Sequence, residues 1–160
     1  MRRLGQVAFA ALAVSTFMPS HAHAQATLGP AVAYHDDFNL GIGAGLNVPV
    51  QEFGRGVSIM ADFFYFFPDN DLNYLELNGN LTYSFPSEDW EVAPYILGGV
   101  NVANVSHDVT DESSTELGVN LGGGLYFDMG RFRPTIGAKI EVSGGKGFVV
   151  FGHLPFVIGG

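Results

Sequence analysis

The sequence predicts an all-β protein, an eight-stranded antiparallel up-and-down transmembrane β-barrel that follows a signal peptide. Two observations predict the barrel: apolar and polar residues alternate with period two in successive segments, and short turn-rich connections separate these segments. A third observation limits how the chain could cross a membrane. No stretch after the leader approaches the roughly 18 consecutive apolar residues of a spanning helix, so strands must make any membrane crossing.

The N-terminus has the three parts of a secretory signal peptide. Met1-Arg2-Arg3 is positively charged, residues 7–14 are apolar, and Ala22-His23-Ala24 has the A-x-A form of a cleavage site. The apolar stretch is well short of the roughly 20 residues that a spanning helix needs. We expect cleavage before Gln25, with Ala24-Gln25-Ala26 as the second candidate site.

The predicted domains are therefore a signal peptide, residues 1–24, and a barrel domain, residues 25–160. The barrel domain retains 136 of the 160 residues, enough for one domain. It keeps five of the seven Lys/Arg and all sixteen Asp/Glu, a net charge of −11, which repels nucleic acid. The chain has no Cys, which excludes disulfides and thiolate metal sites.

The alternation is clearest in residues 73–85. One face carries Asn73, Leu75, Leu77, Gly79, Leu81, Tyr83 and Phe85, and the other carries Tyr74, Glu76, Asn78, Asn80, Thr82 and Ser84. Residues 38–48 repeat the pattern with apolar residues against Gly and Asn. Six further strands are predicted at about 28–35, 56–67, 90–104, 116–127, 132–142 and 147–158.

Every connection is short enough for a hairpin, so consecutive strands are predicted to be antiparallel neighbours in a meander that can close. Strands of this length suit a tilted crossing, which needs about 9–11 residues. With a periplasmic N-terminus, the connection at 106–115 is extracellular and is predicted to be the longest. Its exposed residues are predicted to be His107, Asp108, Asp111 and Glu112.

Eight such strands can form a lipocalin-like soluble carrier with its apolar face inward, or a membrane barrel with that face outward. The polar face favours the membrane barrel. It consists largely of Gly and Asn with single charges, and only 14% of the chain is charged. Small residues with a few opposite charges suit a crowded lumen in which ions pair. The predicted lumen charge network is Asp62, Glu76, Arg133, Lys139 and Glu141.

Aromatic residues gather near the predicted strand ends, as in the two interfacial girdles of membrane barrels. One set lies near one set of strand ends: Phe53, Phe85, Trp90, Tyr126, Phe127, Phe132 and Phe156. The other set lies near the opposite end: Tyr34, Phe38, Phe66, Phe67 and Tyr74.

In these features the whole mature chain resembles the small eight-stranded outer-membrane β-barrel family, of OmpX and OmpA transmembrane-domain type. The resemblance rests on the signal peptide, Gly-x-Gly-x-Gly at 41–45, Gly122-Gly123-Gly124 before Leu125-Tyr126-Phe127, and a final apolar strand. The family's last strand usually ends in an aromatic residue that the barrel assembly machinery reads. This chain instead ends Phe156-Val157-Ile158-Gly159-Gly160, which makes Phe156 the candidate signal.

The residues predict no catalytic, cofactor-binding or metal site. Residues 41–45 are alternate strand positions, because Leu46 occupies the last Gly position of G-x-G-x-x-G. His35, His107 and His153 lack metal-ligand spacing. Ser106-His107-Asp108 joins three hydrolase residue types, but adjacent residues rarely form a triad in space.

The predicted function is a non-catalytic integral outer-membrane barrel with a filled lumen, which supports the envelope or makes contacts through its extracellular loops. Its expected partners are outer-membrane lipid, lipopolysaccharide and the barrel assembly machinery, and the ligand of the loops stays open. Two alternatives remain: a lipid-modifying outer-membrane enzyme with a Ser/His/acid cluster on its outer rim, and a soluble carrier of an apolar ligand.

Overall fold

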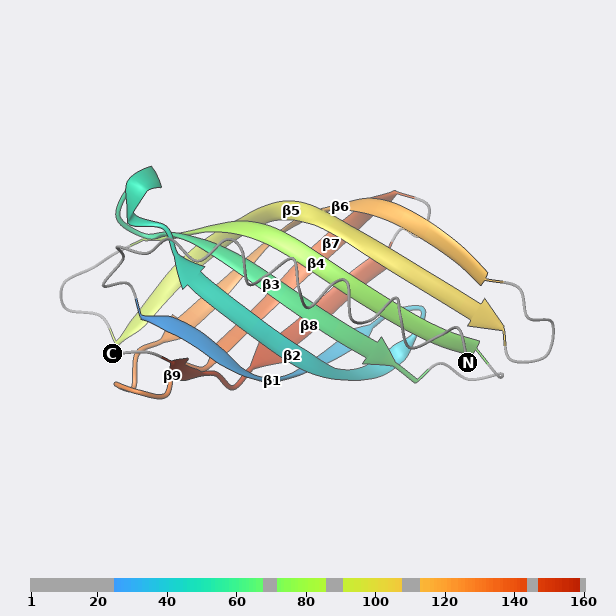
Figure 1. The fold of residues 1–160 in the computed structure, drawn as a ribbon, viewed down its shortest axis with the longest axis horizontal. Coiled ribbons are helices and arrows are strands. Elements are labelled where there is room, and N and C mark those ends of the chain that lie inside the picture. Colours follow the sequence, from blue (N-terminus) through green and yellow to red (C-terminus); the bar gives the residue numbers. More distant parts are fainter. Residues whose placement is uncertain (1–24, 68–71, 86–90, 108–112, 144–146, 159–160) are drawn as a thin grey trace.

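The chain folds into antiparallel strands joined by short connections (Figure 1). The computed structural model describes residues 25–67, 72–85, 91–107, 113–143 and 147–158. The predicted signal peptide lies outside these residues. The elements are β1 (Ala26–His35), β2 (Asn39–Pro49), the 3-10 helix η1 (Gln51–Phe53), β3 (Val57–Phe66), β4 (Leu72–Ser84), β5 (Val92–His107), β6 (Ser113–Phe127), β7 (Thr135–Ser143), β8 (Gly147–His153) and β9 (Phe156–Ile158).

The strands form one closed sheet. Each strand from β1 to β8 pairs antiparallel with the next, and β1 also pairs with β8, for example Ala33 with Phe151. The short β9 continues β8 along β1, where Leu28 pairs with Phe156. β8 and β9 therefore act as one eighth strand interrupted at Leu154–Pro155. The predicted eight-stranded up-and-down antiparallel barrel is confirmed.

The outward-facing side chains are largely apolar, whereas the interior holds the charged and amide side chains together with a hydrophobic cluster that includes Phe64, Phe66 and Phe151. On β4, the side chains of Glu76, Asn78 and Asn80 are 0%, 5% and 3% exposed, whereas Leu77 and Leu81 are 40% and 54% exposed. This is the division that period two predicts for residues 73–85. A lipocalin-like carrier requires the opposite arrangement, so the structure contradicts that alternative.

The strand boundaries agree with the predicted ones to within a few residues, and the differences at the β5–β6 hairpin shorten its connection. β5 ends at His107 and β6 begins at Ser113, and Asn104 pairs with Thr115 inside the ladder. The prediction that this connection is the longest is therefore wrong, because residues 108–112 are a shorter gap than residues 128–134. The described residues contain no helix long and apolar enough to cross a membrane.

Part of the predicted aromatic girdles is also wrong. Phe66 and Tyr74 are 0% and 4% exposed, and Phe38 stacks on Tyr74 with ring centroids 3.9 Å apart. These rings fill the lumen. Tyr126 also turns inward, where its hydroxyl accepts a hydrogen bond from Asn47. Rings that do lie on the outer surface are those of Tyr34, Phe53, Phe67, Phe85 and Phe156.

Glycines let the wall of this narrow barrel pack closely. A Cβ added at Gly99 would lie 2.2 Å from the backbone oxygen of Gly79 and 2.6 Å from the Cα of Asn80. A Cβ added at Gly79, on the outer face of the neighbouring strand, would meet nothing within 4 Å. The two positions are thus close neighbours with opposite steric requirements.

We therefore expect Gly99→Ala to destabilise the barrel by about 1–3 kcal/mol, because backbone atoms would have to shift. Gly79→Ala should leave stability unchanged or raise it by about 0.4–1 kcal/mol, since it only restricts the unfolded chain. Urea unfolding of both variants, refolded in detergent micelles, measures the difference. Equal free energies of unfolding would contradict the close approach at Gly99.

Candidate functional site

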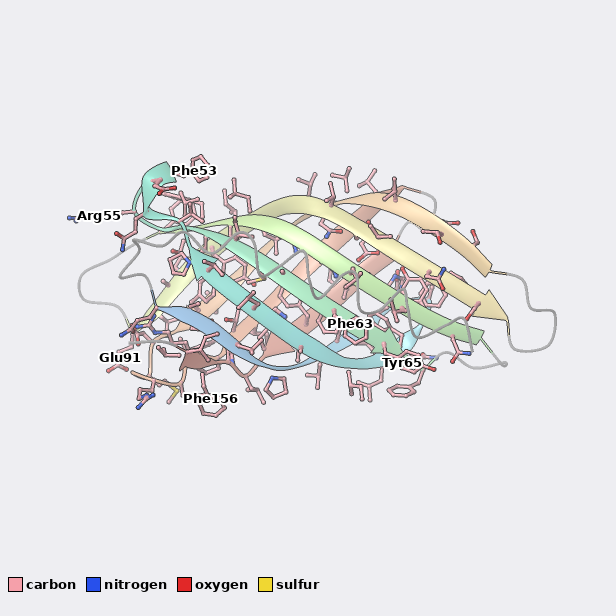
Figure 2. The ribbon with its side chains drawn as sticks, viewed as in Figure 1. Phe53, Arg55, Phe63, Tyr65, Glu91 and Phe156 are labelled. Atoms are coloured by element: carbon pink, nitrogen blue, oxygen red, sulfur yellow. The ribbon has the colours of Figure 1, made fainter. Side chains whose placement is uncertain are left out.

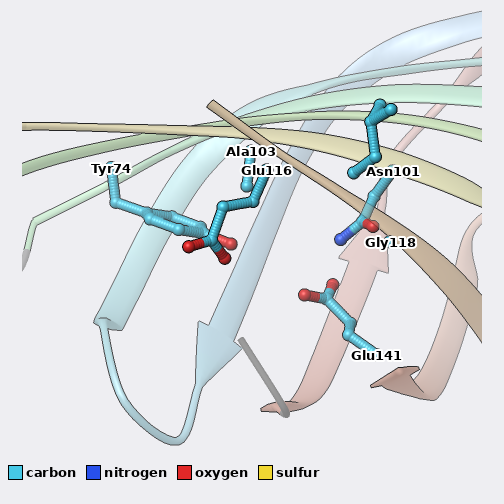
Figure 3. A pocket seen from close by; sticks show the side chains of 7 residues that line it. Tyr74, Asn101, Ala103, Glu116, Gly118 and Glu141 are labelled. Carbon is cyan, nitrogen blue, oxygen red and sulfur yellow. The ribbon is translucent and has the colours of Figure 1, made fainter. Parts of the chain in front are cut away.

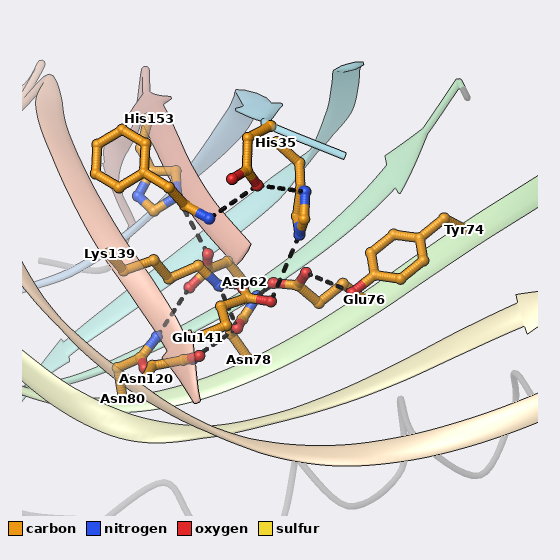
Figure 4. A network of polar contacts seen from close by, with 12 residues as sticks. His35, Asp62, Tyr74, Glu76, Asn78, Asn80, Asn120, Lys139, Glu141 and His153 are labelled. Atoms are coloured by element: carbon orange, nitrogen blue, oxygen red, sulfur yellow. Dashed lines mark hydrogen bonds and ion pairs between the residues drawn. The ribbon is translucent and has the colours of Figure 1, made fainter. Parts of the chain in front are cut away.

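The candidate site is the polar lumen, and its centre is Lys139 on β7. The Lys139 side chain is almost fully buried, and its Nζ lies 2.6 Å from Glu76 Oε1, 2.8 Å from Glu141 Oε1 and 2.5 Å from Asn78 Oδ1 (Figure 4). An ammonium has three N–H donors, so these three acceptors match it. Glu76 also accepts from Asn78 at 2.6 Å.

Three asparagines extend the contacts of Lys139 across the lumen. Asn120 Nδ2 donates to Asn78 Oδ1 at 2.7 Å and to Asn80 Oδ1 at 3.0 Å. Asn80 Nδ2 in turn donates to Asp62 Oδ2 at 3.5 Å. An amide both donates and accepts, so a row of amides links charged groups without adding charge.

Asp62 belongs to a second ion pair. Its Oδ1 lies 3.6 Å from His153 Nε2, and both side chains are at least 94% buried. The geometry therefore divides the lumen charges into a Lys139 cluster (Glu76, Lys139, Glu141) and an Asp62–His153 pair. Asn78, Asn120 and Asn80 connect the two.

His35 closes the lumen at the end of the barrel opposite Ala26 and Ile158. Its ring is 1% exposed and lies edge-on to Phe38, Phe66 and Tyr74, at centroid distances of 4.8, 5.7 and 5.7 Å. His35 Nε2 is 3.8 Å from Glu141 Oε2. Aromatic packing and the Lys139 cluster thus meet at this histidine.

The structure brings together only part of the predicted charge network. Asp62, Glu76, Lys139 and Glu141 all lie in the lumen, but Lys139 contacts the two glutamates and not Asp62. Arg133 lies apart, in the connection before β7, where its Nε is 3.6 Å from Asp128 Oδ1 and its side chain is 34% exposed. The expectation that Arg133 belongs to the lumen network is wrong, because β7 begins only at Thr135.

Of the predicted extracellular loop residues, His107 is the last residue of β5. Asp108, Asp111 and Glu112 lie outside the described residues. Sequence reasoning left His35 and His153 unassigned between surface and lumen, and it did not anticipate the asparagine row. The alternation of side chains could have placed both histidines in the lumen. His35 shares a face with Ala31 and Ala33, and His153 shares one with Phe151, and all of these residues are buried.

One grouping in the described part of the chain has metal-ligand atoms close together: His35, Asp36 and Asp37. Two of these residues already have hydrogen-bond partners at their ligand atoms. His35 Nδ1 accepts from the Asp37 amide at 3.0 Å, and Asp36 Oδ1 accepts from the Phe148 amide at 2.9 Å. The grouping is therefore explained as the closure of the β1–β2 turn against β8.

We expect Lys139→Met to lower the free energy of unfolding by about 3–5 kcal/mol, because it leaves Glu76 and Glu141 buried without a counter-charge. Adding Glu76→Gln to Lys139→Met should recover part of that loss. Denaturant titrations in detergent micelles, arranged as a double-mutant cycle, measure the coupling.

Asp62→Asn is the matched control for that cycle. It also removes a buried carboxylate, but one that pairs with His153 rather than with Lys139. Its coupling to Lys139→Met should be smaller than that of Glu76→Gln. Strict additivity of Lys139→Met and Glu76→Gln would show that the Lys139 cluster contributes nothing as a unit.

No protein-family model and no curated protein matches the sequence. Solved structures do match the fold. The N-terminal β-barrel domain of Pseudomonas aeruginosa OprF is 12% identical, with a TM-score of 0.65 over 85% of this chain and 100% of that one. Neisserial surface protein A is also 12% identical, with a TM-score of 0.65 over 86% and 98%.

The attachment invasion locus protein of Yersinia pestis, Ail, is 20% identical, with a TM-score of 0.54 over 82% of this chain and 94% of that one. In each case the alignment covers nearly the whole barrel of the solved protein. Together with the closed antiparallel sheet, this likeness confirms the predicted architecture: the chain has the fold of the small eight-stranded outer-membrane β-barrels.

Proposed function

We propose that this protein is a non-catalytic integral outer-membrane barrel with a filled lumen, which supports the envelope or makes contacts through the connections at its outer end. The observation that carries the proposal is the apolar outer surface. Large hydrophobic side chains point outward from every strand of the barrel wall (Figure 2). Examples from β1 to β8 are Val32, Ile42, Phe63, Leu81, Val100, Leu121, Ile140 and Phe148, exposed by 38–58%.

A protein–protein interface does not account for this surface. The largest apolar patch on a soluble monomer is usually a few hundred Å² and lies on one side. Here the apolar residues surround the barrel, while the polar residues of the same strands lie inside. That inversion suits a hydrocarbon solvent, in which the backbone groups must also be paired by a closed sheet.

Packing in the interior supports a filled lumen. Met60, Phe64, Phe66 and Lys139 are each at most 2% exposed, and they come from opposite parts of the wall, β3 and β7. An interior of eight strands is only wide enough for its own side chains. A wide diffusion channel does not fit this packing.

A non-catalytic role is supported by where two of the histidines, His35 and His153, lie. An enzyme that acts on membrane lipid needs its general base on the outer rim, within reach of the lipid. His35 and His153 instead point into the lumen and contact Glu141 and Asp62. Both serve as partners of buried carboxylates.

We expect Leu77→Arg to destabilise the barrel by about 2–4 kcal/mol, because it puts a charge on the outer face near the middle of β4. Leu77→Phe, which keeps that position apolar, is the matched control and should stay near wild type. Unfolding of both variants in lipid vesicles gives the comparison. If Leu77→Arg is as stable as Leu77→Phe, the outer face does not contact hydrocarbon.

The orientation follows from a periplasmic N-terminus, which places the β5–β6 connection outside the cell. An epitope tag inserted after Thr110 should be accepted, and antibody should detect it on intact cells. A tag inserted after Gly130, at the opposite end, should be detected only after permeabilisation. The reverse pattern would invert the proposed orientation.

A further inference from the structure

His35 lies between a surface turn and the charged lumen. It is the last residue of β1, and the turn that follows it leads to β2. Its two ring nitrogens meet different groups. Nδ1 lies 3.0 Å from the backbone nitrogen of Asp37 and 3.2 Å from Asp36 Oδ1, whereas Nε2 lies 3.8 Å from Glu141 Oε2. Each nitrogen therefore has a carboxylate beside it, one from the turn and one from β7.

The contact with Asp37 determines the charge of the ring in this structure. A backbone N–H can only donate a hydrogen bond, so Nδ1 accepts it and carries no proton. In a neutral imidazole the proton is then on Nε2, the nitrogen on the side of Glu141. Nδ1 and the carboxylate oxygen of Asp36 consequently face one another as two acceptors, 3.2 Å apart.

Protonation reverses the role of Nδ1. A protonated Nδ1 can no longer accept from the Asp37 N–H, so this amide loses its partner in the ring. The new N–H is beside Asp36 Oδ1, close enough for a charge-assisted hydrogen bond. The imidazolium is then placed between two carboxylates, those of Asp36 and Glu141.

The described ionisable groups around His35 are mostly acidic. They come from the turn and from β4, β6 and β7: Asp36, Asp37, Tyr74, Glu76, Glu116, Lys139 and Glu141. Figure 3 shows Glu116 and Glu141 near Tyr74 at this end of the lumen. The neighbours from β3 and β8, Phe66 and Val149, carry no charge.

The Lys139 cluster leaves one negative charge without a match. Two carboxylates, Glu76 and Glu141, surround one ammonium, so the cluster has a net charge of −1. An imidazolium at His35 brings this charge to zero. Opposite charges a few ångströms apart favour the charged form of both groups, so the surroundings of His35 favour a protonated ring.

We propose that His35 is a pH-sensitive switch that couples the β1–β2 turn to the Lys139 cluster. In the acid form the ring is an imidazolium paired with Asp36 and Glu141. In the basic form it is neutral and accepts from the Asp37 amide. Asp36 stays attached to β8, because its backbone N–H donates to Phe148 O at 3.1 Å and its Oδ1 accepts from the Phe148 N–H at 2.9 Å. The residue released on protonation is therefore Asp37.

This switch goes beyond the proposed function and does not depend on the membrane location. Histidine is the side chain that ordinarily changes charge between about pH 5 and 8. The His35 ring is 1% exposed, but the Asp36 side chain beside it is 51% exposed and connects it with solvent. In the proposed orientation the β1–β2 turn is at the outer end, so the switch responds to the pH of the medium.

Nuclear magnetic resonance of the full barrel in detergent micelles tests the switch between about pH 5 and 8. Ring nitrogen shifts of His35 should show a proton on Nε2 alone at the basic end and on both nitrogens at the acid end. The Asp37 amide resonance should titrate with the same midpoint. After correction for the intrinsic effect of pH, this amide should exchange with solvent about tenfold faster in the acid form, because it has lost a hydrogen bond.

Asp36→Asn should move both midpoints to lower pH, since it removes a carboxylate that favours the imidazolium but keeps an oxygen for the Phe148 amide. Asp128→Asn is the matched control. Asp128 also accepts from a turn amide, that of Gly130 at 3.1 Å, but at the other end of the barrel, so both midpoints should stay unchanged. His35→Gln should abolish the pH response of the Asp37 amide, and Asp36→Asn decides the question if His35→Gln does not fold.

Four results would each overturn the proposal. The first is a proton on Nδ1 of His35 at the basic end of the titration. The second is a His35 ring that keeps one charge over the whole range. The third is an Asp37 amide that does not follow the ring. The fourth is an Asp36→Asn midpoint that differs from wild type no more than the Asp128→Asn midpoint does.

Discussion

Closure of the sheet between β1 and β8 is the constraint on which the rest of this structure depends. A closed sheet has no unpaired edge along the barrel, so its backbone groups are satisfied without water. Closure also assigns alternate side chains of every strand to a narrow interior or to the outer surface. Both the apolar exterior and the crowded polar lumen follow from that assignment.

A lumen that must hold charge in little space needs every donor matched to an acceptor, because a buried ion without a partner is strongly destabilising. The molecule meets this requirement in its middle with Lys139 and its three acceptors. Amides then carry the hydrogen bonds from Asn78 to Asn80 without additional charge. At the His35 end of the lumen, aromatic rings around that histidine fill the space instead.

Most of the fold could be predicted from the sequence because period two is a local signal. In residues 73–85 it separates Glu76 and Asn78 from Leu77, and the structure keeps that separation. On β3, Phe66 is an even number of residues from Asp62, so the same alternation would have placed both side chains in the lumen. The girdle interpretation overrode it, because an aromatic residue at a strand end fits either an interface or an interior.

Contacts across the lumen could not be predicted in the same way. Which side chain meets Lys139 depends on the stagger of strands around the barrel, and alternation within a strand carries no information about stagger. Hence Glu76 and Glu141 reach Lys139, whereas Asp62 meets His153. Arg133 is an even number of residues from Lys139, so alternation alone would place both side chains on one face of β7. Pro134 cannot donate a ladder hydrogen bond, however, and β7 starts after it.

The interrupted eighth strand has a consequence for how the barrel assembles. Every other pairing joins strands that follow one another in the chain, but β1 pairs with β8 and β9, for example Ala26 with Ile158. Closing the long loop between these strands has the largest entropic cost of any strand pair. The break at Leu154–Pro155 divides this pairing into two short ladders. Residues 26–28 of β1 pair with β9, and residues 31–35 pair with β8. The strand pairs with the highest sequence separation are therefore also those with the fewest paired residues, so closing the barrel has the largest entropic cost for the fewest ladder contacts.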